Sequence, residues 1–157
     1  MANTAQELDR LDRKLLALLQ ADGRISNTAL AQAIGLSQSA CLRRVQRLEQ
    51  AGVIEGYGAR LNPAALGRGE TVFIEITLAS QAEAVLDAFE RAVAGSPDIL
   101  ECHLMAGDYD YLLRVAVADS ADYEHLHRKQ LTTLPHVARI RSHFALRRVA
   151  RKLSVAL

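Results

Sequence analysis

The spacing of the apolar residues changes partway along the chain. Up to about residue 51, leucines and isoleucines recur every three or four residues, as they do on one face of an α-helix. From residue 72 the apolar residues alternate instead, which places Val72, Ile74, Ile76 and Leu78 on one face of a predicted strand. We therefore expect the first part of the chain to be helical and the second to be built around a sheet.

The helical part is predicted to hold three short helices. Ser26 or Asn27 can cap the second helix, Gly35 allows a tight turn, and Ser37 can cap a third helix that ends near Ala51. The following stretch "VIEGYGARLNP" alternates like a strand and ends at Pro63. This order predicts a winged helix-turn-helix domain over residues 1–62, with the helix-turn-helix itself at about 27–46.

The second part predicts a different fold. The strand "TVFIEITLA" is followed by a helix from about Gln81, two strands joined by the turn "AGDYD", a helix from Ser120, and a final strand "VARIRSHFALRRVAR". The order βαββαβ is that of a ferredoxin-like domain, which we place at 71–157 after a linker at 63–70. The fold class is thus α+β.

The two faces of the predicted sheet differ in character. The inner face is expected to hold the alternating residues of the first strand together with Leu100, Cys102 and Leu104. The outer face combines apolar groups with opposite charges: Phe73, Glu75, Glu101, His103, Met105, Leu112, Arg114 and Arg141. Such a face fits a self-complementary two-fold interface, and it also fits a solvated sheet.

Composition limits the classes of protein to consider. The apolar fraction is 50% and the charged fraction 24%, which are ordinary values for a globular protein. No apolar run is long enough to cross a bilayer and the N-terminus lacks a signal-peptide core, so we expect a cytoplasmic protein without a membrane partner. The two cysteines, Cys41 and Cys102, predict neither a disulfide framework nor a zinc site, and we expect no metal and no cofactor.

The third predicted helix carries an unusual row of polar side chains. Residues 1–62 hold 8 Lys and Arg against 6 Asp and Glu, so bulk charge alone does not indicate nucleic-acid binding. The exposed side of this helix, however, is predicted to present Ser37, Gln38, Ser39, Arg43, Arg44, Gln46 and Arg47. Arginine binds guanine edges and phosphates, and we expect this uncovered side to contact double-stranded DNA. The alternative is an ordinary solvated face.

Four stretches then carry a family resemblance. They are "LDRLDRKLLALLQADGRISNTALAQAIGLSQSACLRRVQRLEQAGVIEGYGARLNP", "VFIEITL", "ECHLMAGDYDYLLRV" and "LPHVARIRSHFALRRV". In this order they resemble the leucine-responsive/asparagine-responsive (Lrp/AsnC) family of prokaryotic transcription regulators. The resemblance implies DNA binding through the helix-turn-helix, a C-terminal domain of the RAM or ACT-like type that forms dimers, further assembly into tetramers or octamers, and control by a small effector, an amino acid.

The resemblance also implies where the effector binds. The family's pocket includes the turn that corresponds to "GDYDYLL", so the candidate residues are Leu104, Met105, Ala106, Gly107, Asp108, Tyr109 and Asp110, with Ser142, His143, Phe144 and Ala145 from the last strand. The chemistry agrees, because Gly107 permits close backbone approach and an aspartate can hold an ammonium group. A plain hairpin turn in which Asp110 caps the backbone is the alternative.

An enzyme and a free-standing amino-acid-binding module are the two other classes of protein that this sequence could represent. An enzyme is not expected, because the five histidines show no metal-ligand spacing and no nucleophile or phosphate-loop motif is present. Some haem-pathway decarboxylases share the architecture, but they would not need an exposed arginine row. A free-standing amino-acid-binding module would leave the first 60 residues without a role.

Overall fold

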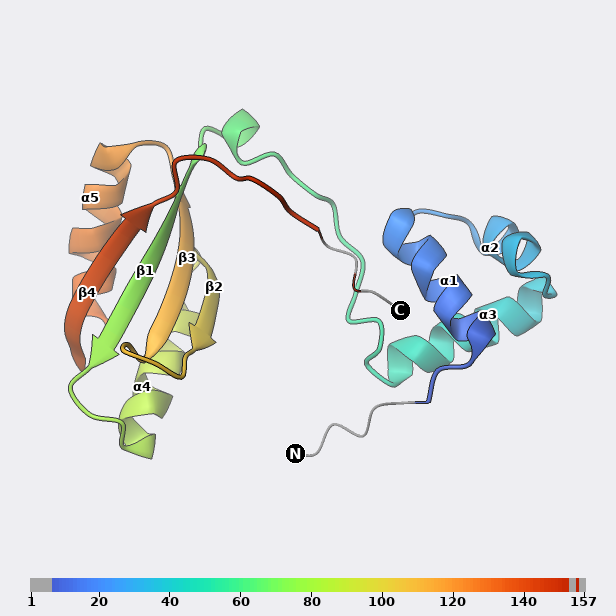
Figure 1. The fold of residues 1–157 in the computed structure, drawn as a ribbon, viewed down its shortest axis with the longest axis horizontal. Coiled ribbons are helices and arrows are strands. Elements are labelled where there is room, and N and C mark those ends of the chain that lie inside the picture. The colour runs from blue at the N-terminus through green and yellow to red at the C-terminus, as the bar shows by residue number, and fades with distance from the viewer. Residues whose placement is uncertain (1–6, 153–154, 156–157) are drawn as a thin grey trace. The chain divides into compact units, whose positions relative to one another are not determined.

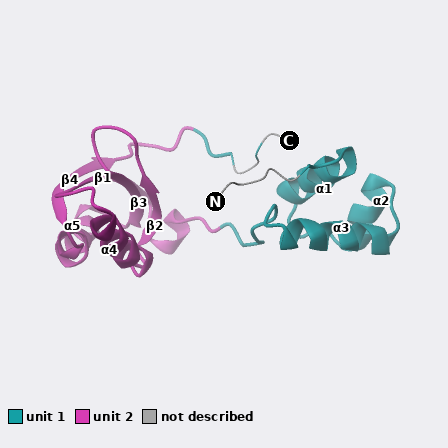
Figure 2. Ribbon diagram, turned by 90° about the horizontal axis from the view of Figure 1, so that it is seen from below, with its two compact units in different colours: residues 1–60, 150–157 teal, residues 61–149 magenta. Residues whose placement is uncertain are grey.

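The computed structural model describes residues 7–152 and 155 of the 157-residue chain. The described residues form two compact units (Figure 2). The first runs to Arg60 and also includes the end of the chain from Ala150, and the second spans Leu61–Val149. Each unit has its own hydrophobic core.

The first unit is a bundle of three helices: α1 (Arg10–Ala21), α2 (Asn27–Ile34) and α3 (Gln38–Gln50). Ser26 caps α2 and Ser37 caps α3, each through a side-chain oxygen that accepts a backbone N–H three residues on. Gly35 ends α2 in the left-handed conformation, at φ 74°, which favours glycine. Leu15, Leu30, Cys41 and Leu48 are fully buried between the helices, as the spacing predicts.

The strand predicted over residues 53–63 is wrong for this structure. Residues 55–62 are described and belong to no strand, because no other segment of the described chain pairs with them. Alternation of side chains fits an extended backbone, but a strand also needs a hydrogen-bonded neighbour.

The second unit is a four-stranded antiparallel sheet with two helices (Figure 1). A 3-10 turn, η1 (Ala64–Leu66), leads into β1 (Glu70–Leu78), α4 (Glu83–Ala94), β2 (Ile99–Leu104), β3 (Tyr111–Val117), α5 (Ser120–Lys129), η2 (Leu131–Thr133) and β4 (Val137–Phe144). The strand order is β2-β3-β1-β4. The predicted ferredoxin-like fold is therefore confirmed, and β1 and β3 are its central strands.

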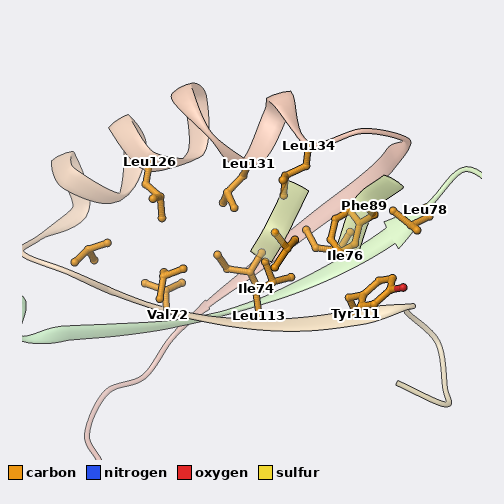
Figure 3. Packing of buried hydrophobic residues seen from close by; sticks show 13 residues of the cluster. Val72, Ile74, Ile76, Leu78, Phe89, Tyr111, Leu113, Leu126, Leu131 and Leu134 are labelled. Carbon is orange, nitrogen blue, oxygen red and sulfur yellow. The ribbon is translucent and has the colours of Figure 1, made fainter. Parts of the chain in front are cut away.

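One face of the sheet packs against the helices (Figure 3). Val72, Ile74 and Ile76 of β1 pair with Val115, Leu113 and Tyr111 of β3, and all six side chains are buried. Phe89 of α4 and Leu126 of α5 cover them. This core fixes the positions of the strand ends, where the candidate effector residues lie.

Two predictions for the sheet need correction. Leu100 and Leu104, expected on the inner face, are 48% and 61% exposed. The register shift between Ile99 and Glu101 places Ile99, and not Leu100, opposite the buried Val115, so Leu100 leaves the inner face. Leu104 does lie on the predicted face, opposite the buried Tyr111, and it is exposed because β2 is an edge strand. The last strand also ends at Phe144, earlier than the alternation to Arg151 predicts.

None of the helices in the described residues is long and apolar enough to cross a membrane.

Candidate DNA-binding and effector sites

The start of α3 is built by short-range contacts. The Ser37 hydroxyl accepts the Ala40 N–H at 3.2 Å, and the Asn27 side-chain amide at the start of α2 donates to the Gln38 carbonyl at 2.9 Å. Together with the left-handed Gly35, these contacts fix the angle between α2 and α3. The helix thus begins with its backbone N–H groups and small side chains facing outward, which is suitable for close approach to a ligand.

The structure leaves most of the predicted DNA-binding row uncovered within its own unit. Six of its members are exposed: Ser37, Gln38, Ser39, Arg43, Gln46 and Arg47. Arg44 is the exception, because it is half-buried against the start of α1. Cys41 and Leu48 lie on the opposite, buried side of the helix.

Two of the three arginines form ion pairs with carboxylates at the start of α1. Arg44 Nη1 donates to Asp9 Oδ2 at 2.7 Å and to Asp12 Oδ1 at 2.8 Å, and Arg47 Nη2 donates to Asp12 Oδ2 at 2.5 Å. Asp12 is 1% exposed, whereas the Arg44 and Arg47 side chains are 26% and 49% exposed. Arg43 is exposed and makes no ion pair with any residue that the structure describes.

These contacts shift the titration of the outer members of the cluster. The pKa of Asp9 lies below its ordinary value because its carboxylate accepts the Asp12 backbone N–H and faces the Arg44 guanidinium. The pKa of Arg44 is raised in turn by its hydrogen bonds to Asp9 and Asp12. Both shifts favour the charged forms of Asp9 and Arg44, so this ion pair persists at neutral pH.

Sequence reasoning missed Asp9 and Asp12, although a sign of their role is present. Asp12 lies four residues after Leu8 and three before Leu15, which places an acidic side chain within the apolar stripe of α1. A carboxylate in such a position requires a buried partner. The arginines of α3 are the natural candidates.

The turn between β2 and β3 is organised around Asp110. Asp110 is 7% exposed, and its carboxylate accepts the Leu78 backbone N–H and the Gln81 side-chain amide, both at 2.7 Å. Its backbone N–H donates to Ile76 and its carbonyl accepts the Met105 N–H. Asp110 thus ties the turn to the end of β1 and to the loop that leads into α4.

The other residues of this turn are more open. Ala106, Gly107 and Asp108 are exposed, and a Cβ atom added at Gly107 would meet nothing within 4 Å. Met105 and Tyr109 are half-buried, and Leu104 is exposed on the edge strand. Asp108 accepts no hydrogen bond from the described residues, so its carboxylate is available to an outside group.

The second predicted effector stretch lies elsewhere in the sheet. Ser142 and Phe144 pair with Ile74 and Val72, and the Ala145 N–H donates to Thr71, so this stretch follows β1 toward its start. The turn around Asp110 lies instead at the end of β1. Within one chain the structure does not bring the two predicted stretches together, and a ligand that touches both would need a second copy.

The stretch from Ser142 to Ala145 has local partners of its own. Tyr123 of α5 shares a hydrogen bond with Ser142, and its ring packs against Phe144 edge to face with centroids 5.1 Å apart. His143 lies 3.1 Å from Glu75 Oε1 across the strand pair.

The outer face of the sheet carries two cross-strand clusters. In the first cluster Arg141 Nη1 forms an ion pair with Glu75 Oε2 at 3.2 Å, and His143 lies beside the same carboxylate. In the second, Arg114 Nη2 forms an ion pair with Glu101 Oε1 at 2.6 Å, and His103 lies beside that carboxylate. The pKa of Glu101 is lowered by its hydrogen bond from Arg114. Phe73 and Leu112 lie on the same face. Opposite charges and apolar groups thus lie side by side on this face of the sheet, as the sequence predicts.

The part of the chain that the structure describes offers little for metal binding or for a reactive thiol. It holds no group of three His, Cys, Asp or Glu residues placed to bind a metal ion. Cys41 is buried, and burial together with the nearby Glu90 raises the pKa of Cys102 to about 11, which makes that thiol a poor nucleophile at neutral pH.

Comparison with known proteins covers almost the whole chain. Residues 8–55 match the family model described as winged helix-turn-helix DNA-binding, and residues 71–155 match that of the Lrp/AsnC ligand binding domain. The leucine-responsive regulatory protein of Escherichia coli strain K12 is 46% identical over 144 residues, which are 92% of this chain and 88% of the relative.

Solved structures agree with this match. A transcriptional regulator of Neisseria meningitidis, solved as a complex with L-Met, superposes with a TM-score of 0.88 at 32% identity, over 96% of this chain and 97% of the other. An AsnC family regulator from Agrobacterium tumefaciens gives a TM-score of 0.88 at 36% identity, over 95% and 97% of the two chains.

Proposed function

Because the chain belongs to the Lrp/AsnC family of transcriptional regulators, we propose that its α3 is the helix that contacts DNA. The observation that carries this assignment is the exposed polar row from Ser37 to Arg47, set on a helix whose other side is buried. A helix of this kind after a tight turn fits the major groove of B-DNA. The small residues at its start allow the backbone to approach the bases.

Arg43 is the member of the row that should contribute most directly. Its guanidinium is exposed, whereas Arg44 and Arg47 already bind carboxylates. A bidentate contact to guanine contributes about 1–3 kcal/mol of discrimination between bases. A contact to phosphate contributes instead to binding of any sequence and makes it salt-dependent.

The test replaces Arg43 by alanine. We expect R43A to bind a duplex selected by the unaltered protein about tenfold more weakly, as loss of one good base contact implies. A lost phosphate contact would also flatten the plot of log K against log salt by about 0.9. Arg91→Ala, which removes the same charge from the exposed surface of α4, is the matched control. Equal binding by R43A and R91A would refute the assignment.

The second unit is proposed to bind an amino-acid effector at the turn from Leu104 to Asp110. The match to a ligand-binding domain and the L-Met complex of the Neisseria relative support this proposal. In this turn the exposed Asp108 can accept an ammonium group, while Asp110 is occupied by the backbone and holds the turn in shape. A thermal-shift screen of the twenty amino acids on the unaltered protein and on Asp108→Ala tests it. A ligand that stabilises both proteins equally would rule out Asp108.

Assembly is proposed to use the outer face of the sheet. Its clusters around Glu75 and Glu101, with Phe73 and Leu112 between them, are suited to a two-fold contact in which each copy presents the same surface. A dimer would present two helix-turn-helix units to the same DNA. The two half-sites of the bound DNA should therefore lie one helical turn apart, about 34–36 Å, or a multiple of that distance. The stretch Ser142–Ala145 of a second copy is then the proposed partner of the turn in the effector site.

The family is one of transcriptional regulators, and we propose that this member has no catalytic role. A regulator of chromosomal genes in a prokaryote works in the cytoplasm, which is the location we propose. A haem-pathway decarboxylase of the same architecture, which would act on a tetrapyrrole rather than on DNA, is the alternative, and titration with haem distinguishes the two. A stoichiometric shift of the haem absorption band would favour the enzyme.

A further inference from the structure

We infer that Asp9 and Asp12, at the start of α1, are specificity-determining residues of the DNA-binding face. They hold Arg44 and Arg47 and balance their charge, so that binding depends on fitted contacts more than on bulk attraction. This inference rests on the proposed function of α3. It assigns a role in DNA selection to two acidic residues that lie on a different helix.

The geometry of the cluster supports a fixed arrangement. Asp9 and Asp12 form a capping box, in which the Asp9 carboxylate accepts the Asp12 N–H at 2.7 Å and the Asp12 carboxylate accepts the Asp9 N–H at 3.2 Å. Both oxygens of Asp12 also accept an arginine. Because Asp12 is buried, its position is set by the core of the unit, and it sets the positions of the two guanidinium groups in turn.

The cluster changes the charge that an approaching DNA meets. Two carboxylates oppose Arg44 and Arg47, whereas Arg43, the third arginine of α3, forms no ion pair within the described part of the chain. Binding to DNA of any sequence comes mainly from neutralising phosphates. Carboxylates that already bind two arginines compete with those phosphates and therefore weaken sequence-independent binding.

The arginines nevertheless keep donors for a fitted partner. A guanidinium has five N–H donors, and the contacts to Asp9 and Asp12 involve a single nitrogen of each arginine. The remaining donors point in a direction that is already fixed. A DNA sequence whose acceptor groups match this direction binds side chains that are already ordered, and so avoids the entropic cost of ordering them.

A purely structural ion-pair cluster predicts something different. In that case loss of a carboxylate would lower the stability of the unit, and any loss of DNA binding would be equal for matched and unmatched sequences. A selective role predicts a change in the ratio of the two affinities. The ratio is therefore the decisive quantity.

The experiment uses two duplexes and three variants of the full chain. One duplex is selected in vitro by the unaltered protein from a random library, and the other is a scrambled duplex of the same composition. Asp12→Asn removes the buried charge with little change in shape. Asp9→Asn breaks the contact to Arg44, and asparagine caps helices as well as aspartate does, so α1 should stay folded. Glu55→Gln, which removes an exposed carboxylate of the same unit, is the control.

We expect D12N to bind the scrambled duplex more tightly than the unaltered protein does. The ratio of the affinity for the selected duplex to that for the scrambled duplex should fall about tenfold, which is small beside the specificity ratio of a typical DNA-binding protein. The salt slope on the scrambled duplex should steepen by about 0.9 for each arginine that gains a phosphate. D9N should change in the same direction by less, and E55Q should leave the ratio unchanged. An unchanged ratio in D9N would overturn the inference, as would equal weakening on both duplexes in D12N.

The same duplexes separate this inference from the proposed function. If R43A loses affinity while the ratio stays constant in D9N and D12N, the acidic residues have no selective role and α3 remains the DNA-binding helix. If R43A binds both duplexes normally, the assignment of α3 itself is wrong.

Discussion

Replacement of Asp110 tests how the effector turn is held. Its carboxylate accepts two hydrogen bonds at 2.7 Å, from the Leu78 backbone N–H and from Gln81, while it is itself buried. Hydrogen bonds to a charged group contribute about 1.5–3 kcal/mol each, and a buried donor left without a partner costs about 1–3 kcal/mol. Asp110→Ala should therefore lower the free energy of unfolding of the second unit by about 3 kcal/mol.

Urea unfolding together with hydrogen exchange of the β1 peptide measures this loss. The Leu78 amide should exchange much faster in D110A, because its acceptor is gone. Asp108→Ala is the matched control, since Asp108 is exposed in the same turn, and its cost should stay within about 0.5 kcal/mol. If D110A unfolds no more easily than D108A, the account of Asp110 as the organiser of the turn is wrong.

The same variant bears on the ligand. With the turn loosened, D110A should respond weakly to an effector, while its affinity for DNA without effector should survive, because the first unit is unaltered. Calorimetry that gives D110A normal effector affinity would show that the ligand does not depend on the shape of the turn.

Two further predictions concern the first unit. Gly35→Ala should lower its stability by about 1–2 kcal/mol in thermal unfolding, because φ is 74° and the added Cβ meets nothing within 4 Å, so the cost is one of backbone conformation alone. Gly35→Asn should lose less, and equal losses would contradict this reasoning. The folded-state pKa of Asp9 is depressed by the Asp12 N–H and Arg44, so its stabilising effect is present above the unfolded value near 3.8 and is lost as pH falls through the folded value. Between about pH 5 and pH 2 the melting temperature of the unaltered protein should therefore fall further than that of D9N, and parallel curves would show that Asp9 contributes nothing.

Local patterns in the sequence predict much of this fold. The change from helical to alternating spacing places the helices and strands, and Ser26, Gly35 and Ser37 mark the ends of α2 and α3 through short-range backbone chemistry. The alternation in β1 correctly predicts its buried face. These features depend on residues within a few positions of one another.

Features that depend on distant partners are harder to predict. Leu100 and Leu104 look like core residues in the sequence, but a register shift and an edge position leave them exposed. The stretch 55–62 alternates like a strand and has no pairing partner in the described chain. The pairing of Asp12 with Arg44 and Arg47 spans more than thirty residues, with separations of 32 and 35, and appears only when α1 packs against α3.

The candidate sites show the same division. Helical periodicity predicts the exposed row on α3, but it does not predict that Arg44 and Arg47 form ion pairs with carboxylates of another helix. Likewise the turn at Gly107 and Asp108 is visible in the sequence, but the engagement of Asp110 by Leu78 and Gln81 depends on how β3 pairs with β1.

The most direct test of the central claim is a cross-linking measurement on α3. A photoreactive amino acid is placed at Ser39, on the exposed start of the helix, and in a second protein at Glu124, exposed on α5. On irradiation with the selected duplex, position 39 should cross-link to DNA and position 124 should not. Cross-linking at position 124 with none at position 39 would contradict the claim that α3 lies against the DNA.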